Sequence, residues 1–188
     1  MSSDFPPPTG TAGHIFWLFG LSGAGKSTLA TTLIGGLRAR RIPVLALDGD
    51  VLRTGLCRGL GFSDNDRAEN LRRAAEAAKL GTDSGLCVVA SFITPLESHR
   101  RIITGILGPQ NLSLVHVSAP LEVCRSRDTK GLYARAQAGQ VAQMTGLSSA
   151  FEAPQHADLV IPTAHEEIAA CAAKLLQFAM ARLAPARG

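Results

Sequence analysis

The feature that most constrains the fold is a short apolar run, His14–Phe19, followed at once by the segment Gly20–Ser27 with the sequence GLSGAGKS. This segment matches the pattern G-x-x-x-x-G-K-[ST] at every fixed position. Leu29, Leu33 and Leu37 then recur at helical spacing. The order predicts a buried strand, a glycine-rich loop and a helix, which is the arrangement of a phosphate-binding loop in an α/β fold.

Four further apolar runs predict strands, at Pro43–Leu47, Leu86–Phe92, Leu112–Val117 and Asp158–Ile161. We expect two more helices, one from Ser63 to about Ser84, between two of these strands, and one from Thr163 to about Leu183, after the last strand. Each follows a capping-box pattern, Ser63 with Asp66 and Thr163 with Glu166. Alternating strands and helices predict an α/β fold, with a mostly parallel five-stranded sheet covered by helices on both faces.

Length and composition indicate one globular domain of residues 14–184 in a chain of 188 residues, 46% of them hydrophobic, with a net charge of +4. Residues 1–13 are rich in Pro, Ser, Thr and Gly, which predicts a disordered tail. The basic residues are dispersed, so we expect an anionic small molecule rather than a nucleic acid as the partner. We expect no membrane span and no signal peptide, and four free thiols in the cytoplasm.

The loop chemistry identifies a nucleoside triphosphate as the donor. Glycines let backbone N–H groups surround phosphate oxygens, Lys26 can bridge the β- and γ-phosphates, and the Ser27 hydroxyl can ligate Mg²⁺. The loop therefore predicts a nucleoside triphosphate together with Mg²⁺. The donor-binding residues predicted here are Gly20, Leu21, Ser22, Gly23, Ala24, Gly25, Lys26, Ser27 and Thr28.

Two carboxylates, Asp48 and Asp50, end the second predicted strand. Beside a phosphate site such groups can hold Mg²⁺ or its waters, or accept a proton from an attacking hydroxyl. A plain Asp-Gly turn is the alternative. Further along, residues of about 128–151 lack clear periodicity, which is typical of a flexible lid.

A series of short motifs resembles the adenylylsulfate kinases (APS kinases), which are P-loop kinases with a three-layer sandwich fold. The resemblance extends over roughly residues 14–162. Its motifs are Asp48-Gly49-Asp50, Leu60-Gly61-Phe62-Ser63, Asp66-Arg67 with Glu69-Asn70, Ser91-Phe92-Ile93 with Pro95, Arg127-Asp128, Lys130-Gly131-Leu132-Tyr133, Thr145-Gly146 and Glu152-Ala153-Pro154.

The resemblance implies transfer of the γ-phosphoryl group of ATP to the 3′-hydroxyl of adenosine 5′-phosphosulfate, as in sulfate assimilation, by a homodimer. Lys26 and Asp50 would be catalytic, with Asp50 near the acceptor hydroxyl, and Ser27 and Asp48 would hold the metal. Arg127 would contact the ATP adenine. The residues implied to bind the acceptor are Asp48, Asp50, Arg53, Phe62, Arg67, Asn70, Ile93, Thr94, Lys130, Leu132 and Met144.

The chain departs from the family pattern at three places. Val51 stands where the family usually has Asn, and Thr94 where it usually has Ser. In the lid several charges are missing, and Met144 replaces the second aromatic residue that sandwiches the acceptor adenine. A thioether can cover a ring face, although it cannot stack as Phe does.

Three other functions remain open. The altered lid would suit a related kinase with another nucleotide-like acceptor. A shikimate or gluconate type of kinase would leave Phe62, Arg67 and Asn70 unexplained, although Phe62 taken alone is an ordinary core candidate. The third is a nucleotide-binding module without catalytic activity, and the presence of Lys26 and Asp50 argues against it.

Overall fold

The computed structural model describes residues 13–128, 131–139 and 144–184. Its five strands form one parallel sheet in the order β2-β3-β1-β4-β5. The strands are β1 (Ile15–Phe19), β2 (Val44–Asp48), β3 (Cys87–Phe92), β4 (Leu112–Ser118) and β5 (Leu159–Pro162). The helices in the described residues are α1 (Lys26–Ala39), α2 (Gly49–Thr54), α3 (Asp64–Asp83), α4 (Glu97–Leu107), α5 (Leu121–Arg127), α6 (Leu132–Gln137) and α7 (Ile168–Leu183).

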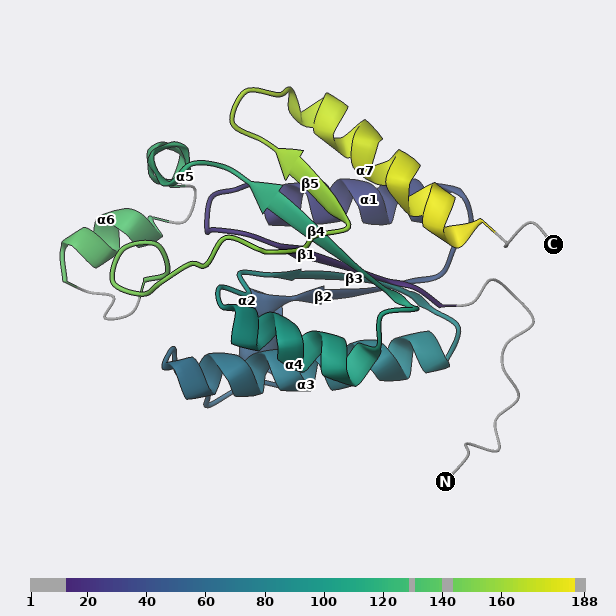
Figure 1. The fold of residues 1–188 in the computed structure, drawn as a ribbon, viewed down its shortest axis with the longest axis horizontal. Coiled ribbons are helices and arrows are strands. Elements are labelled where there is room, and N and C mark those ends of the chain that lie inside the picture. Colours follow the sequence, from purple (N-terminus) through teal and green to yellow (C-terminus); the bar gives the residue numbers. More distant parts are fainter. Residues whose placement is uncertain (1–12, 129–130, 140–143, 185–188) are drawn as a thin grey trace.

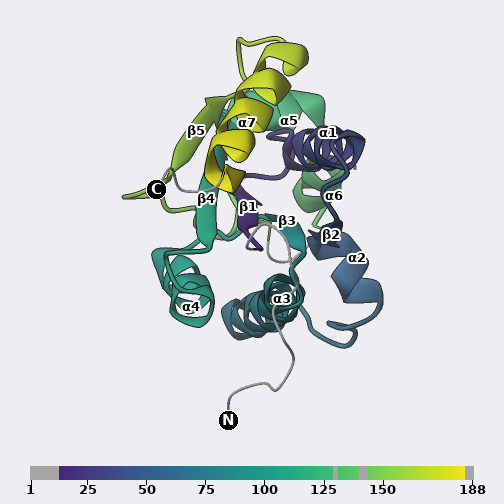
Figure 2. The ribbon, with the colours of Figure 1, turned by 90° about the vertical axis from the view of Figure 1, so that its right-hand side faces the viewer.

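The sheet is the middle of three layers. Helices α1 and α7 cover one face, and α3 and α4 cover the other (Figure 1). Turning the molecule by 90° shows the same separation, with α2 beside the β2 edge (Figure 2). Helices α5 and α6 lie beyond the carboxyl ends of the strands, on the left in Figure 1. The predicted α/β sandwich with a five-stranded parallel sheet is therefore confirmed.

Strand β1 lies at the centre because all five of its side chains are apolar and buried. Alternation along a strand sends successive side chains to opposite faces. Phe16 and Leu18 accordingly join the core under α1 and α7, while Ile15, Trp17 and Phe19 join the core under α3 and α4. A strand apolar on both faces can be buried only between two helical layers, so β1 fixes where the phosphate loop emerges.

The start of α3 matches its prediction, whereas the start of α7 does not. The Ser63 Oγ accepts a hydrogen bond from the Asp66 N–H at 3.1 Å, so Ser63 is the N-cap of α3. Helix α7 begins at Ile168 rather than after Thr163. The Thr163 hydroxyl instead donates to the Ala24 carbonyl oxygen at 2.8 Å, which ties the β5–α7 loop to the phosphate loop. The predicted capping box at Thr163 is therefore wrong.

Several elements were not anticipated from sequence patterns. Helix α4 fills the connection between β3 and β4, and α6 lies inside the segment expected to be irregular. The four cysteines are buried free thiols, as predicted. Within the described residues no helix is both long and apolar enough for a membrane span. Of the predicted tail, residues 1–12 lie outside the described residues.

Candidate active site

A single cavity of about 630 Å³ opens beyond the carboxyl ends of β1, β2 and β3 and brings most of the predicted site residues together. Such a crevice is where parallel α/β sheets bind ligands. The predicted residues that line it are Ser22, Gly23, Gly25, Lys26, Ser27, Thr28, Asp48, Asp50, Arg53, Phe62, Arg67, Asn70, Ile93, Thr94, Arg127 and Leu132.

Two positions in the phosphate loop leave no room for a side chain. A Cβ on Gly20 would lie 2.2 Å from the carbonyl oxygen of Val117. A Cβ on Gly23 would lie 2.6 Å from the carbonyl oxygen of Cys124, and Gly23 also has a φ of 79°. Glycine at these positions lets the loop pack closely on β4 and α5. Loops of this kind can turn their N–H groups toward phosphate oxygens.

Lys26 is the first residue of α1, at the helix end where the macrodipole is positive. Its Nζ donates to the Leu21 carbonyl oxygen at 2.7 Å, across the phosphate loop. Lys26 and its neighbours Gly25 and Ser27 at the helix terminus all line the cavity. That arrangement provides a ready site for phosphate oxygens.

Ser27 and Asp48 form an oxygen pair beside the loop. The Ser27 Oγ lies 3.3 Å from Asp48 Oδ2, and Asp48 Oδ1 accepts the Asp50 N–H at 2.9 Å. Mg²⁺ prefers hard oxygen ligands and is usually held by one or two protein groups together with substrate phosphates. This pair fits that requirement. In the part of the chain that the structure describes, no group of three or more His, Cys, Asp or Glu side chains could hold a metal.

Asp50 lies in the first turn of α2, on the exposed side of the same cavity. The Asp48 side chain caps α2 through the Asp50 N–H. One carboxylate thus orients the backbone that carries the other. Asp50 thus lines the same cavity as the phosphate loop and the residues predicted to bind the acceptor, and its place near the acceptor hydroxyl stays a prediction.

On the other side of the cavity, two guanidinium groups surround one aromatic ring. The Cζ of Arg53 lies 4.4 Å from the centroid of the Phe62 ring, and that of Arg67 lies 5.6 Å from it. Arg53 Nη1 also donates to the Gly61 carbonyl oxygen at 2.8 Å, and Arg67 Nε to the Phe62 carbonyl oxygen at 2.9 Å. Burial, and then the nearby Arg53, lower the pKa of Arg67. Two cations held this close favour an anionic ligand.

Phe62 is 54% exposed, although it is a large apolar residue. It therefore does not act as a core residue, the alternative that its sequence position left open. A rigid ring at the mouth of a cavity that contains arginines is suited to stack on a planar base.

Asn70 contributes an unpaired polar atom. It is 4% exposed and lines the cavity, and its Oδ1 has no hydrogen-bond partner among the described residues. A buried acceptor left without a partner costs about 1–3 kcal/mol. Such an atom is available to accept a hydrogen bond from a ligand or a water in the cavity.

Thr94 holds an uncommon backbone conformation at the base of the cavity. Its φ is 45°, in the left-handed region, where a β-branched residue is an outlier. Conformations of this kind cost about 1–3 kcal/mol and cluster at functional sites. The structure thus singles out Thr94 independently of its place in the motif series.

The opposite end of the cavity is formed by Arg127 and the β5–α7 loop. Arg127 Nη1 donates to the Thr163 Oγ1 at 3.3 Å, and its Nη2 donates to the Thr163 carbonyl oxygen. The loop residues Ala164–Glu167, together with Ile168 and Cys171 of α7, also line the cavity. Sequence reasoning missed these residues, because Thr163 matched a helix cap and the loop after it carries no recognisable motif.

Similarity to known proteins identifies the family of this chain. A family model described as adenylylsulphate kinase matches residues 12–162. The chain belongs to the adenylylsulphate kinase family. Among curated relatives, the adenylyl-sulfate kinase of Paraburkholderia xenovorans is 52% identical over 151 residues, which are 80% of this chain and 84% of that protein. That of Shewanella amazonensis is 47% identical over 169 residues, 90% of this chain and 85% of that protein.

A solved structure of the same family has the same architecture. The APS kinase CysC of Mycobacterium tuberculosis, in complex with AMPPNP and APS, superposes with a TM-score of 0.86 at 38% identity. The match covers 93% of this chain and 99% of that one. The family predicted from the motif series is confirmed by these three likenesses.

The segment predicted to be a lid is hydrogen-bonded to the phosphate loop. The Tyr133 hydroxyl donates to the Ser22 carbonyl oxygen at 3.0 Å, and burial raises the pKa of Tyr133 to about 12. The Asp128 carboxylate accepts the N–H groups of Tyr133 and Ala134, at 3.1 Å and 3.0 Å, and so caps α6. Tyr133 and Asp128 belong to the motif series, but no role was predicted for them.

Four predicted site residues do not line the cavity. Gly20, Leu21 and Ala24 belong to the phosphate loop itself. Met144 is 4% exposed and packs in the same apolar core as Tyr133. Its contact with an acceptor base stays a prediction, and making that contact would require the side chain to leave this packing. Lys130 lies outside the described residues.

Proposed function

We propose that this chain transfers the γ-phosphoryl group of ATP to the 3′-hydroxyl of adenosine 5′-phosphosulfate. The observation that carries the proposal is the division of one cavity into two halves. The phosphate loop lines what we call the donor half, Phe62, Arg67 and Asn70 line what we call the acceptor half, and Asp50 lines the same cavity. A relative with 38% identity has been solved with AMPPNP and APS together.

In the donor half, the phosphate loop and the N-terminus of α1 hold the phosphates of ATP. Lys26 places its positive charge where the γ-phosphoryl group leaves, and such charge stabilises mainly the transition state. When bound through Ser27 and Asp48, Mg²⁺ would neutralise charge on the phosphate oxygens. Arg127 and the β5–α7 loop border the space for the donor base.

In the acceptor half, Phe62 stacks on the adenine while Arg53 and Arg67 supply the positive charge for the phosphosulfate. Asn70 Oδ1 accepts a hydrogen bond from the ribose or the base. Ile93, Thr94 and the lid residue Leu132 complete the wall. Charge-assisted contacts with arginine suit phosphate and sulfate oxygens, because the guanidinium group presents a planar fork of donors.

Asp50 acts on the acceptor hydroxyl. Its carboxylate accepts the proton of the 3′-hydroxyl as the oxygen forms a bond to the γ-phosphorus. The bond from that phosphorus to the β–γ bridging oxygen breaks, and ADP leaves. Holding both substrates in one cavity supplies the orientation that phosphoryl transfer mainly requires.

A coupled assay of ADP release tests the proposal. Purified protein is given ATP, Mg²⁺ and one acceptor at a time: adenosine 5′-phosphosulfate, shikimate or a cytidine diphosphate derivative. We expect release only with adenosine 5′-phosphosulfate. Turnover with another acceptor would favour the related-kinase alternative, and no turnover with any of them would favour a nucleotide-binding module without catalytic activity.

We also propose that the protein works as a homodimer, as the family resemblance implies, and in the cytoplasm, as the scattered free cysteines indicate. Both statements stay predictions. The molar mass in solution, measured by light scattering with and without ATP, tests the first. Fractionation of cells that express the chain tests the second.

A further inference from the structure

Thr94 has an energetically unfavourable backbone conformation and lies in the wall of the cavity. It is 1% exposed, lines the acceptor half of the cavity and has a φ of 45°. A β-branched residue keeps such a backbone only where its surroundings hold it there. The groups that hold Thr94 should therefore matter for the acceptor half, even if they never touch a substrate.

Two side chains hold Thr94 from below the cavity. The indole Nε1 of Trp17 donates to Thr94 Oγ1 at 2.9 Å, and Trp17 stacks on Phe92 with ring centroids 4.8 Å apart. Arg100 Nη1 donates to the carbonyl oxygen of Thr94 at 3.2 Å and to that of Pro95 at 3.4 Å. Neither Trp17 nor Arg100 lines the cavity.

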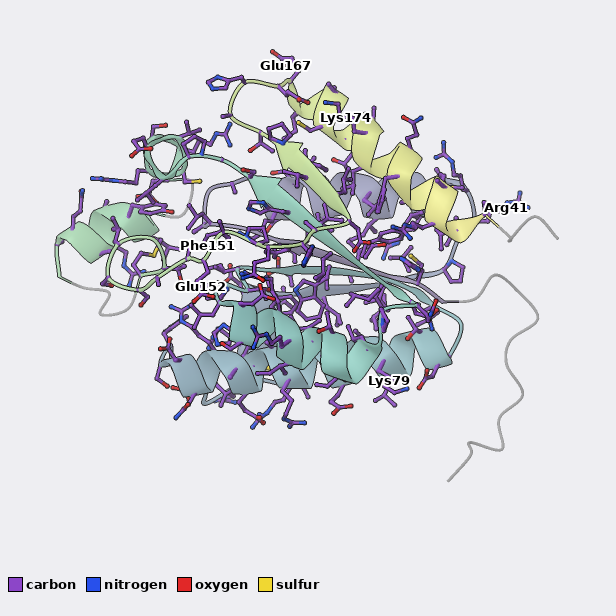
Figure 3. All side chains as sticks on the ribbon, in the orientation of Figure 1. Arg41, Lys79, Phe151, Glu152, Glu167 and Lys174 are labelled. Carbon is purple, nitrogen blue, oxygen red and sulfur yellow. The ribbon has the colours of Figure 1, made fainter. Side chains whose placement is uncertain are left out.

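Arg100 also reaches the segment that returns from the lid. Its Nη2 donates to the Glu152 carbonyl oxygen at 3.2 Å, and the Glu152 N–H donates to the Pro95 carbonyl oxygen at 2.9 Å. The Glu152 carboxylate accepts the N–H of Glu97, the first residue of α4, and Figure 3 labels Glu152 beside that end of the helix. Arg100 Nε completes the network by pairing with Glu97 Oε2 at 2.9 Å.

This network does more than the fold requires. Arg100 is 2% exposed, and burying a guanidinium group carries a large desolvation penalty that a well-packed apolar residue would avoid. Three of its hydrogen bonds go to backbone carbonyls, two of them on residues that line the cavity. The penalty is thus offset by contacts concentrated on the acceptor wall and on the end of the lid segment.

We infer that Arg100 is a positioning residue for the acceptor. It holds Thr94 and Pro95 in the shape that the acceptor needs and joins that wall to the lid return at Glu152. The inference rests on the proposed function, because it assigns the Thr94 side of the cavity to adenosine 5′-phosphosulfate. Trp17 is a second positioning residue, because it holds the Thr94 side chain by a hydrogen bond.

Steady-state kinetics of Arg100→Met test the inference. Met keeps much of the apolar stem and removes every donor. Losing contacts of a charged group typically weakens an interaction about tenfold or more. We expect the KM for adenosine 5′-phosphosulfate to rise by at least about tenfold, while the KM for ATP changes less than about twofold. Arg100→Lys should fall between wild type and Arg100→Met. The matched control is Arg101→Met, since Arg101 is exposed on the same helix and should behave as wild type.

Trp17 supplies a second readout that needs no turnover. It is the single tryptophan of the chain and is bonded to Thr94, so its fluorescence reports on the wall directly. We expect a shifted emission maximum in folded Arg100→Met and none in Arg101→Met. If Arg100→Met does not fold, Trp17→Phe tests the other contact, and it should raise the acceptor KM several-fold.

The outcomes are distinguishable from failure of the proposed function. Wild-type protein without activity toward adenosine 5′-phosphosulfate would refute the proposed function, and the fluorescence comparison would still test the link from Arg100 to Thr94. An active wild type with unchanged acceptor KM in folded Arg100→Met, or with equal rises in both KM values, would overturn the inference. So would an unchanged acceptor KM in Trp17→Phe when Arg100→Met does not fold.

Discussion

Replacing Asn70 by alanine should affect acceptor binding and the stability of the free protein differently. Asn70 lies on α3 and is 4% exposed, and its Oδ1 lacks a partner among the described residues. If the acceptor supplies that partner, Asn70→Ala removes an interaction that exists only in the complex. We therefore expect weaker acceptor binding with little change in the stability of the free protein.

The expected changes in the free energies of unfolding and of acceptor binding depend on the hydrogen bonding of Asn70 Oδ1. An unpaired buried acceptor costs about 1–3 kcal/mol, and Asn70→Ala removes that penalty. The lost packing of a small side chain opposes this gain, so the free energy of unfolding should change by less than about 1 kcal/mol. In the complex the same substitution leaves a substrate donor unpaired, again about 1–3 kcal/mol. This corresponds to a rise of about 5–150-fold in the acceptor KM.

Urea unfolding and initial rates at saturating ATP measure the two quantities. Asn65→Ala is the matched control, because Asn65 is exposed on the same helix. Asn65→Ala should leave both quantities near wild type. A loss of about 2 kcal/mol or more in stability, with an unchanged acceptor KM, would refute the reasoning and make Asn70 a structural residue.

Four further predictions address the donor, the base, the lid and the core. Lys26→Ala should lower kcat by about 10²-fold or more, because it removes charge aimed at the transferring group; near-normal kcat would contradict the donor assignment. Asp50→Asn should lower kcat by about 10²–10⁴-fold while ATP binding, measured by calorimetry, persists; lost ATP binding would indicate a metal or structural role. Met144→Phe should lower the free energy of unfolding by about 1–3 kcal/mol, since Met144 is buried in a packed core, and unchanged urea unfolding would show that the site has room for the ring. Burial, and then Arg182, lower the pKa of His14 to about 4, so between about pH 6.5 and pH 4 the unfolded chain takes up a proton that the folded protein does not. Urea stability should fall as the pH drops through this window, and the fall should be smaller in His14→Gln.

The two central strands β1 and β3 could be predicted because they are buried on both faces. Ile15–Phe19 and Cys87–Phe92 are wholly buried, and continuous apolar runs of this length signal such strands without tertiary information. Ser63 also acted as predicted, because a cap depends on local hydrogen bonds. Thr163 shows the limit of local rules, since its hydroxyl bonds to Ala24, which is 139 positions away in the sequence.

The candidate site could be predicted where motif and chemistry coincide, as at Lys26, Ser27 and Asp48. The residues that support it could not. Arg100 and Trp17 act through Thr94, and their roles depend on contacts between segments distant in the chain. Tyr133 lies within a motif, yet its bond to Ser22 could be seen only once the lid and the phosphate loop were placed together. Short-range patterns carry no information about such pairs.

The position of the transferred phosphate shows directly whether the chain phosphorylates the 3′-hydroxyl of adenosine 5′-phosphosulfate. The protein is incubated with adenosine 5′-phosphosulfate and ATP labelled in the γ-phosphoryl group, with Lys26→Ala as the inactive control. We expect a labelled product, 3′-phosphoadenosine 5′-phosphosulfate, from which a 3′-nucleotidase releases all of the label. Label that the 3′-nucleotidase cannot remove, or label in inorganic phosphate alone, would contradict the account.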